Sequence, residues 1–250
     1  MRFCRPLQLL QNQNMLENSM NAEQVMAHLE ANGTAQNRKI YARHGAGVNQ
    51  FGVSFAELEK LRKTIKRDHA LALALWDTEN FDARNLATMI ADPLKMSAKD
   101  LEHWAKSTNT HSHPGLISTY ILPTSPHTRA KVESWLVSQH EYVVQLGWNC
   151  VSGMAVWATE LPDEFFAEKL KVLQAGIHEA QNRVKHARVM CLISIGLRSA
   201  KLEALALSAA KRIGKVDVDH GETSCVTPEP AAYIAKAKAH TSKKKARPVG

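Results

Sequence analysis

The stretch LEKLRKTIKRDHALALALWDTENFDARNLATMIADP, residues 58–93, contains three helix patterns separated by very few residues. Leu58, Leu61 and Ile65 recur at the spacing that places them on one face of a helix. The run from Ala70 to Trp76 is apolar on nearly every side, and such a helix is stable only between other helices. Helices stacked around a buried middle layer are the unit that α-solenoids repeat. The stretch therefore predicts an all-α repeat fold.

The second and third patterns each begin after a residue that can cap a helix. Asp68 precedes the apolar run, and Asn80 precedes the third pattern. In a helix after Asn80, the spacing predicts that Leu86 and Ile90 face inward and that Arg84 faces outward.

Three later segments repeat a narrow apolar stripe at helical spacing. Because the joints between them are short, we expect these helices to stack as antiparallel pairs. The stripes consist of Phe166, Leu170, Leu173 and Ile177, then of Val184, Ala187, Cys191 and Ile195, and then of Leu202, Leu205, Ala209 and Ile213.

The sequence pattern divides the chain into three parts. Residues 1–20 are rich in Gln and Asn without sustained periodicity and are predicted to form a disordered leader, in which Met15 and Met20 are alternative starts. Residues 21–240 are predicted to form one helical-repeat domain, and residues 241–250 a basic disordered tail. Inside the domain, residues 215–228 lose the helical periodicity and predict an ordered loop or a brief extended piece.

The composition narrows the possible functions. Lys plus Arg number 32 and Asp plus Glu 24, so the formal net charge is +8, which indicates either a polyanionic partner or simply a cationic surface. The four cysteines form no C-x-x-C pair, which argues against a zinc ribbon or a redox motif and favours a reducing cytoplasm. No apolar run reaches the length of a membrane span, so no membrane association is expected.

One long segment, FGVSFAELEKLRKTIKRDHALALALWDTENFDARNLATMIADP, resembles the corresponding part of the DNA alkylation repair family, the HEAT-like-repeat alkylpurine DNA glycosylases. The resemblance lies in the order and spacing of GV, LR, an apolar stretch ending in LW, and AR-LA. NRVKHARVMCLISIGLR and AAKRIGKVDVDHGETSC also resemble members of one branch of that family. The resemblance implies a curved right-handed α-solenoid of about six HEAT-like helix pairs.

The resemblance also implies that the protein is a monomer that binds double-stranded DNA without a cofactor. If the helices stack into a curved array, equivalent basic positions would line one concave surface and contact phosphates. The other interpretation is an ordinary solvated helix face. Gln145 stands where the family has a basic residue in its long central helix. The basic candidates are Arg84, Arg183, Lys185 and Arg188.

The catalytic residues of the family have no obvious counterparts here. Those enzymes carry a Trp and a catalytic Asp after the helix that matches Trp104, and a second Trp further on; the aligned residues are His111, Gly115 and Met190. No Asp or Glu occurs between Glu102 and Glu133. A neutral glycine cannot stabilise the cationic sugar that forms as the base departs. Asp100 and Glu102 are the nearest alternative carboxylates.

We therefore expect a DNA-binding protein with weak or altered activity toward N-alkylpurines such as 3-methyladenine and 7-methylguanine. Two alternatives remain open: an active glycosylase that uses another carboxylate, and a non-enzymatic scaffold that binds a protein through its concave face. His111 and His113, with His103 before them, form an H-x-H pattern. Since no carboxylate or cysteine completes a ligand set nearby, no metal site is expected.

Overall fold

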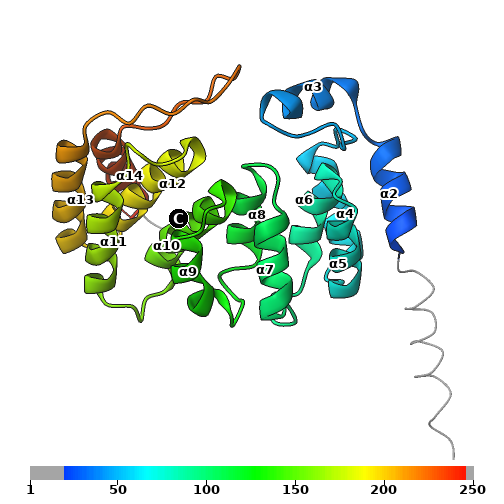
Figure 1. The fold of residues 1–250 in the computed structure, drawn as a ribbon, viewed down its shortest axis with the longest axis horizontal. Coiled ribbons are helices and arrows are strands. Elements are labelled where there is room, and N and C mark those ends of the chain that lie inside the picture. The colour runs from blue at the N-terminus through cyan, green and yellow to red at the C-terminus, as the bar shows by residue number, and fades with distance from the viewer. Residues whose placement is uncertain (1–19, 246–250) are drawn as a thin grey trace, which may run out of the picture. The chain divides into compact units, whose positions relative to one another are not determined.

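The computed structural model describes residues 20–245, with side chains up to residue 240. These residues form thirteen α-helices and no strand, apart from one isolated bridge between Gly33 and Val53 (Figure 1). The all-α prediction is confirmed. The predicted leader, residues 1–20, lies outside the described residues except for Met20, and so do residues 246–250 of the predicted tail.

The described chain divides into two compact units, and the domain predicted for residues 21–240 contains parts of both. Unit 1 comprises residues 20–41 and 47–92, and unit 2 comprises residues 42–46 and 93–245. The helices that begin in unit 1 are α2 (Ala22–Ala31), α3 (Ala35–Arg43), α4 (Phe55–Ile65), α5 (His69–Asp77) and α6 (Phe81–Ile90).

Side chains cap the first turns of α2, α5 and α6, and the sequence predicted two of these caps, Asp68 and Asn80. The Asn21 side chain accepts the Gln24 amide while the Gln24 side chain accepts the Asn21 amide, which makes a capping box for α2. Asp68 caps α5 by accepting the Leu71 amide, and Asn80 caps α6. These caps satisfy amides that have no partner inside their own helix.

Helix α6 is buried along its whole length, and this overturns the expectation that Arg84 faces outward. All ten residues of α6 are buried, and the Arg84 side chain is 2% exposed. Its Nε donates to the Trp76 carbonyl at 3.0 Å, and its guanidinium lies 4.9 Å from the centre of the Trp76 ring. Glu79 lies 3.7 Å from the same guanidinium. Arg84 is therefore a buried structural residue, because partners within unit 1 satisfy its charge.

Asp82 of α6 fixes the chain that precedes α4. Its Oδ2 accepts the amides of Phe51 and Gly52 at 2.6 and 3.0 Å, and its Oδ1 accepts the amide of Val53 at 2.9 Å. Burial raises the pKa of Asp82, and the three amide hydrogen bonds oppose that rise. Gly52 is required here because it has a positive φ of 79° and a Cβ would lie 2.6 Å from the Thr34 carbonyl oxygen.

Unit 2 holds the other eight described helices around a core that includes Trp104, Trp135, Trp148 and Phe166. Helix α10 is the central one, since it packs against α7, α8, α9 and α12. The helices are α7 (Ala98–Ser107), α8 (His113–Tyr120), α9 (Thr128–Leu136), α10 (Glu141–Trp157), α11 (Asp163–Ala175), α12 (Asn182–Gly196), α13 (Ala200–Ile213) and α14 (Pro230–Lys245).

The predicted stripes of residues 166–177 and 184–195 are buried, but in α13 the prediction is wrong at Leu205, and Ile213 is only half-buried. Leu205 is 42% exposed, whereas its neighbour Ala206 is fully buried. The smaller residue faces the core because α12 approaches closely there: a Cβ on Gly196 would lie 3.0 Å from the Ala206 Cβ.

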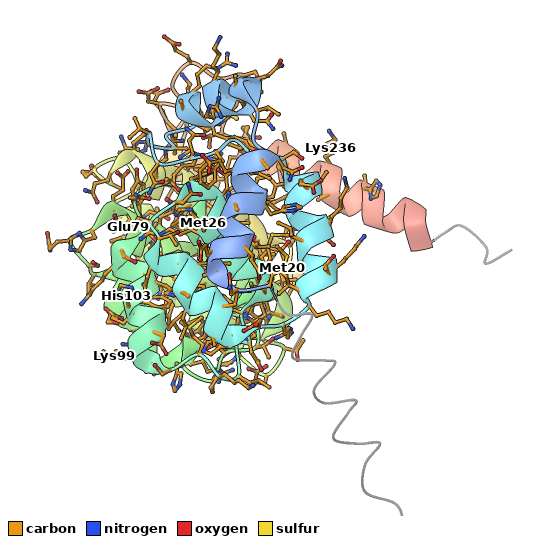
Figure 2. All side chains as sticks on the ribbon, turned by 90° about the vertical axis from the view of Figure 1, so that its right-hand side faces the viewer. Met20, Met26, Glu79, Lys99, His103 and Lys236 are labelled. Atoms are coloured by element: carbon orange, nitrogen blue, oxygen red, sulfur yellow. The ribbon has the colours of Figure 1, made fainter. Side chains whose placement is uncertain are left out.

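The segment between α13 and α14 is irregular over residues 214–229, as the lost periodicity predicted. Asn182, at the start of α12, holds it in place: its side chain donates to the Asp219 carbonyl at 2.6 Å and accepts the Asp219 amide at 2.8 Å. Helix α14 then continues to Lys245, past the predicted boundary at residue 240. The Ala and Lys residues of α14 have high helix propensity, which favours this extension. Ile234 is its buried contact, whereas Lys236 is exposed (Figure 2).

Candidate nucleic-acid interface

Three helices of unit 2 border a shallow groove of about 500 Å³. Helices α8, α10 and α12 each contribute a short row of side chains, most of them small or neutral and polar. No charged residue is among those that line it. The lining residues are Gly115, Ser118, Thr119, Pro123, Asn149, Ser152, Gly153, Val156, Trp157, Met190 and Ser194.

Hydroxyl contacts join the helices along this groove. The hydroxyls of Ser152 on α10 and Ser194 on α12 lie 2.7 Å apart, and the Ser118 hydroxyl on α8 donates to the Asn149 carbonyl at 3.2 Å. Met190 and Ser194 are the residues of the Val189–Gly196 segment that are not buried. The groove is therefore lined mainly by small and neutral residues, together with the larger side chains of Trp157 and Met190.

The position aligned with the catalytic Asp of the family opens onto this groove. A Cβ built on Gly115 meets no atom within 4 Å, so an added side chain would find open space. Gly115 and Met190, which the sequence alignment singled out, both line the groove. The third aligned residue, His111, is not a lining residue and lies two residues before the start of α8.

His111 belongs to a group of basic side chains that we call the imidazole cluster, defined as His111, Arg183, His186 and His220. Its members come from the chain before α8, from the first turns of α12 and from the 214–229 segment. All four side chains are half-buried. His186 lies one helical turn before Met190, so the cluster lies at one end of the groove.

Two of the imidazoles share one hydroxyl. His186 Nδ1 and His220 Nε2 lie 3.0 and 2.9 Å from the Thr227 hydroxyl, and the two rings meet edge to face with centres 5.4 Å apart. A hydroxyl has one hydrogen, so Thr227 donates to one ring and accepts from the other. The pairing ties the 214–229 segment to α12.

Gln145 and Glu141 of α10 form hydrogen bonds with the backbone of two cluster residues, His111 and Arg183. Gln145 is 7% exposed and donates to the His111 carbonyl at 2.8 Å. Glu141 accepts the backbone amide of Arg183 at 2.6 Å. Gln145 was predicted to contact DNA, but the structure places it beneath the surface, where it positions His111.

The surroundings of the cluster disfavour protonated imidazoles. Burial lowers the pKa of His111 to about 4, and Arg183, His44, His186 and His220 contribute to the same shift. Burial also lowers the pKa of His186, with His220 and Arg183 adding to the effect. The pKa of His220 is lowered by burial and by Arg183, while Asp219 opposes the change. The imidazoles are therefore neutral at pH 7.

The other predicted basic residues, Arg188 and Lys185, differ in whether groups within the protein bind their charge. Arg188 donates to the Gly176 carbonyl, and its guanidinium lies 5.1 Å from the centre of the Trp148 ring. Its charge is thus engaged within the protein. Lys185 is half-buried, and nothing among the described side chains forms an ion pair or hydrogen bond with its ammonium group.

The two alternative carboxylates have structural partners away from the groove lining. Asp100 accepts the Ser97 amide and hydroxyl and completes the capping box of α7. Glu102 pairs with Lys106 and Lys131 at 3.2 and 3.0 Å and accepts the Trp135 indole. Burial raises the pKa of Glu102, but these contacts outweigh it and the net shift is downward. Neither carboxylate is among the residues that line the groove.

No group of three or more His, Cys, Asp or Glu side chains in the described part of the chain is arranged to hold a metal ion. Between residues 20 and 245, none of the helices has both the length and the apolar character needed to cross a bilayer.

The stacked helices and the groove define a HEAT-like helical-repeat protein, as comparison with a solved structure confirms. That structure is described as a new family of proteins related to the HEAT-like repeat DNA glycosylases with affinity for branched DNA structures. It matches this chain with a TM-score of 0.80 and 26% identity, over 89% of this chain and 95% of its own.

The family follows from the sequence match. Residues 25–226 match the DNA alkylation repair enzyme family, and the chain belongs to that family. An uncharacterized protein of Listeria innocua serovar 6a is 26% identical over 224 residues, which cover 86% of this chain and 96% of that protein. An uncharacterized protein of Listeria monocytogenes serovar 1/2a is 26% identical over 227 residues, with coverage of 88% and 98%.

Sequence reasoning missed both His186 and His220 as site residues. The structure brings both to Arg183, although His220 is far from it in sequence. The sequence signal available was the position of His186 three residues after Arg183, on the same face of one helix.

Proposed function

We propose that this protein binds branched DNA as a monomer through the α8–α10–α12 groove and the imidazole cluster, and that it excises alkylated bases weakly or not at all. The observation that carries the proposal is a groove at the family's catalytic position that contains no charged side chain. A glycosylase of this family needs a carboxylate there to stabilise the sugar cation. A protein that binds DNA without cleaving the glycosidic bond does not need this carboxylate.

Two cationic side chains on α12, one of the helices that border the groove, support DNA as the ligand. Among the described residues, neither the Arg183 guanidinium nor the Lys185 ammonium has a hydrogen-bond or ion-pair partner. Other arginines of unit 2 are engaged: Arg198, for example, donates to the carbonyls of Ala155 and Leu161. A half-buried guanidinium without a partner is suited to bidentate contact with a phosphate.

The relative described as having affinity for branched DNA makes branched DNA the form to test first. At a branch point several backbones converge, so phosphate density is higher than on a linear duplex. A cationic site next to a neutral groove would therefore favour a junction over an isolated duplex. Duplex arms would supply further nonspecific phosphate contacts.

The first prediction concerns the two free cations. Arg183→Glu with Lys185→Glu is expected to weaken binding to a synthetic four-way junction by about tenfold or more, because two phosphate contacts become repulsive. The slope of log affinity against log salt should fall by about one for each phosphate that the variant no longer neutralises. Fluorescence anisotropy on a labelled junction at several salt concentrations measures both quantities.

The control is Lys99→Glu with Lys236→Glu, which changes net charge equally at exposed positions on α7 and α14 (Figure 2). A smaller effect in the control supports the proposed surface. Equal weakening in both variants would mean that only net charge matters. No DNA binding by the wild type would favour the scaffold that binds a protein partner.

A further inference from the structure

We propose that the imidazole cluster binds a phosphodiester of the DNA backbone and takes up a proton as it does so. The inference rests on the proposed DNA binding and adds the atoms that contact the phosphate and the pH dependence of that contact. It is carried by the geometry of four basic side chains from three segments of unit 2 that meet at one end of the groove.

The cluster presents unused hydrogen-bonding groups. Thr227 occupies His186 Nδ1 and His220 Nε2, which leaves His186 Nε2 and His220 Nδ1 without a protein partner in the described structure. The side chains of His111 and Arg183 also make no hydrogen bond to any described residue. All four side chains are partly exposed, so a phosphate oxygen can reach these nitrogens.

The sign of the net charge around the cluster depends on whether its imidazoles are protonated, because carboxylates and other titratable groups also face it. From α10, Glu141 bonds to the Arg183 amide and Tyr142 lies close enough for Arg183 to affect its pKa. From the 214–229 segment, Asp219 faces His220. From residues 42–46, His44 faces His111, and a Cβ on Gly45 would lie 3.6 Å from His111 Nδ1.

With neutral imidazoles, the Arg183 guanidinium is the only positive charge of the cluster, and the nearby carboxylates Glu141 and Asp219 weaken its attraction for an anion. Each proton added to an imidazole shifts the balance toward positive charge. A bound phosphate would in turn stabilise the imidazolium and raise its pKa. Phosphate and proton thus bind cooperatively at this site.

The direction of the pH effect follows from the free state. The pKa values of His111, His186 and His220 are all lowered in the free protein. A bound phosphate raises them because its negative charge stabilises the imidazolium, and binding therefore consumes protons. Affinity must then increase as pH falls. One proton taken up corresponds to about a tenfold gain in affinity per pH unit, between the free and bound pKa values. We expect this dependence between about pH 7 and pH 5.

The test measures the affinity of the full chain for a four-way junction from pH 7.5 to 5.5 at constant ionic strength. The variant carries His111→Gln, His186→Gln and His220→Gln, since glutamine retains hydrogen bonding but does not titrate in this range. The control is His140→Gln, at an exposed histidine before α10. The wild type and the control should gain about tenfold per pH unit, and the triple variant about threefold or less.

Proton uptake can also be measured on the wild type alone, so the result does not depend on whether the triple variant folds. Calorimetry of junction binding at pH 6.5, in buffers with different ionisation enthalpies, should show about one proton taken up by the wild type. An equal pH slope in the triple variant, or no proton uptake by the wild type, overturns the inference while leaving DNA binding intact. Absence of binding at every pH instead overturns the proposed function.

Discussion

Under single-turnover conditions, release of 7-methylguanine from methylated DNA is expected to be at least about a hundredfold slower than by a family member with the catalytic carboxylate. One well-placed electrostatic stabiliser contributes about 10²- to 10³-fold in rate, and Gly115 supplies none. His111 and Met190 also stand where the family has aromatic walls, so the flipped nucleotide would be held less well.

The same groove permits a gain-of-function experiment. Gly115→Asp together with His111→Trp is expected to raise the excision rate, because a Cβ at position 115 meets no neighbouring atom and the carboxylate can extend over the groove. The matched control replaces Gly115 with Asn, which has the same size without the charge. Equal rates for the Asp and Asn variants would show that charge at this position is not the missing element.

Robust excision by the wild type would contradict the prediction outright. Asp100→Asn and Glu102→Gln would then identify which carboxylate replaces the missing one. Glu102 variants require a stability measurement alongside, because this side chain pairs with Lys131 and accepts the Trp135 indole.

The largest effect on stability is expected from Asp82→Ala, which should lower the free energy of unfolding of unit 1 by about 3–5 kcal/mol. The substitution leaves the amides of Phe51, Gly52 and Val53 without their acceptor, and two of these bonds are buried. A buried donor without an acceptor costs about 1–3 kcal/mol.

Urea unfolding followed by circular dichroism measures the decrease in stability. Glu30→Ala, at an exposed position on α2, should change stability by less than about 0.5 kcal/mol. A decrease below about 1 kcal/mol in Asp82→Ala would mean that the chain before α4 relaxes to find water or other acceptors.

Local signals made much of the fold predictable from the sequence. Asn21, Asp68 and Asn80 act on amides within three residues, so their capping roles are visible without the rest of the protein. The orientation of Arg84 was not predictable in this way. Whether an arginine faces solvent depends on which helices surround it, and Arg84 is satisfied by Trp76 and Glu79 instead.

The residues of the candidate site also divide into those that the sequence could predict and those that it could not. Gly115 and Met190 could be singled out by alignment, and the structure places both on one groove. The imidazole cluster could not be foreseen, because His111, His186 and His220 share no local pattern. Their meeting depends on how α12 packs on α10 and on the contact between Asn182 and Asp219.

The complete burial of α6 has a consequence for how unit 1 opens to solvent. A helix with no exposed residue has no local fluctuation that brings its backbone to water without displacing neighbouring helices. Its amide protons should exchange with deuterium only when the surrounding helices separate. The slowest exchanging amides of unit 1 will thus be those of α6, and their rate reports the free energy of opening of the whole unit.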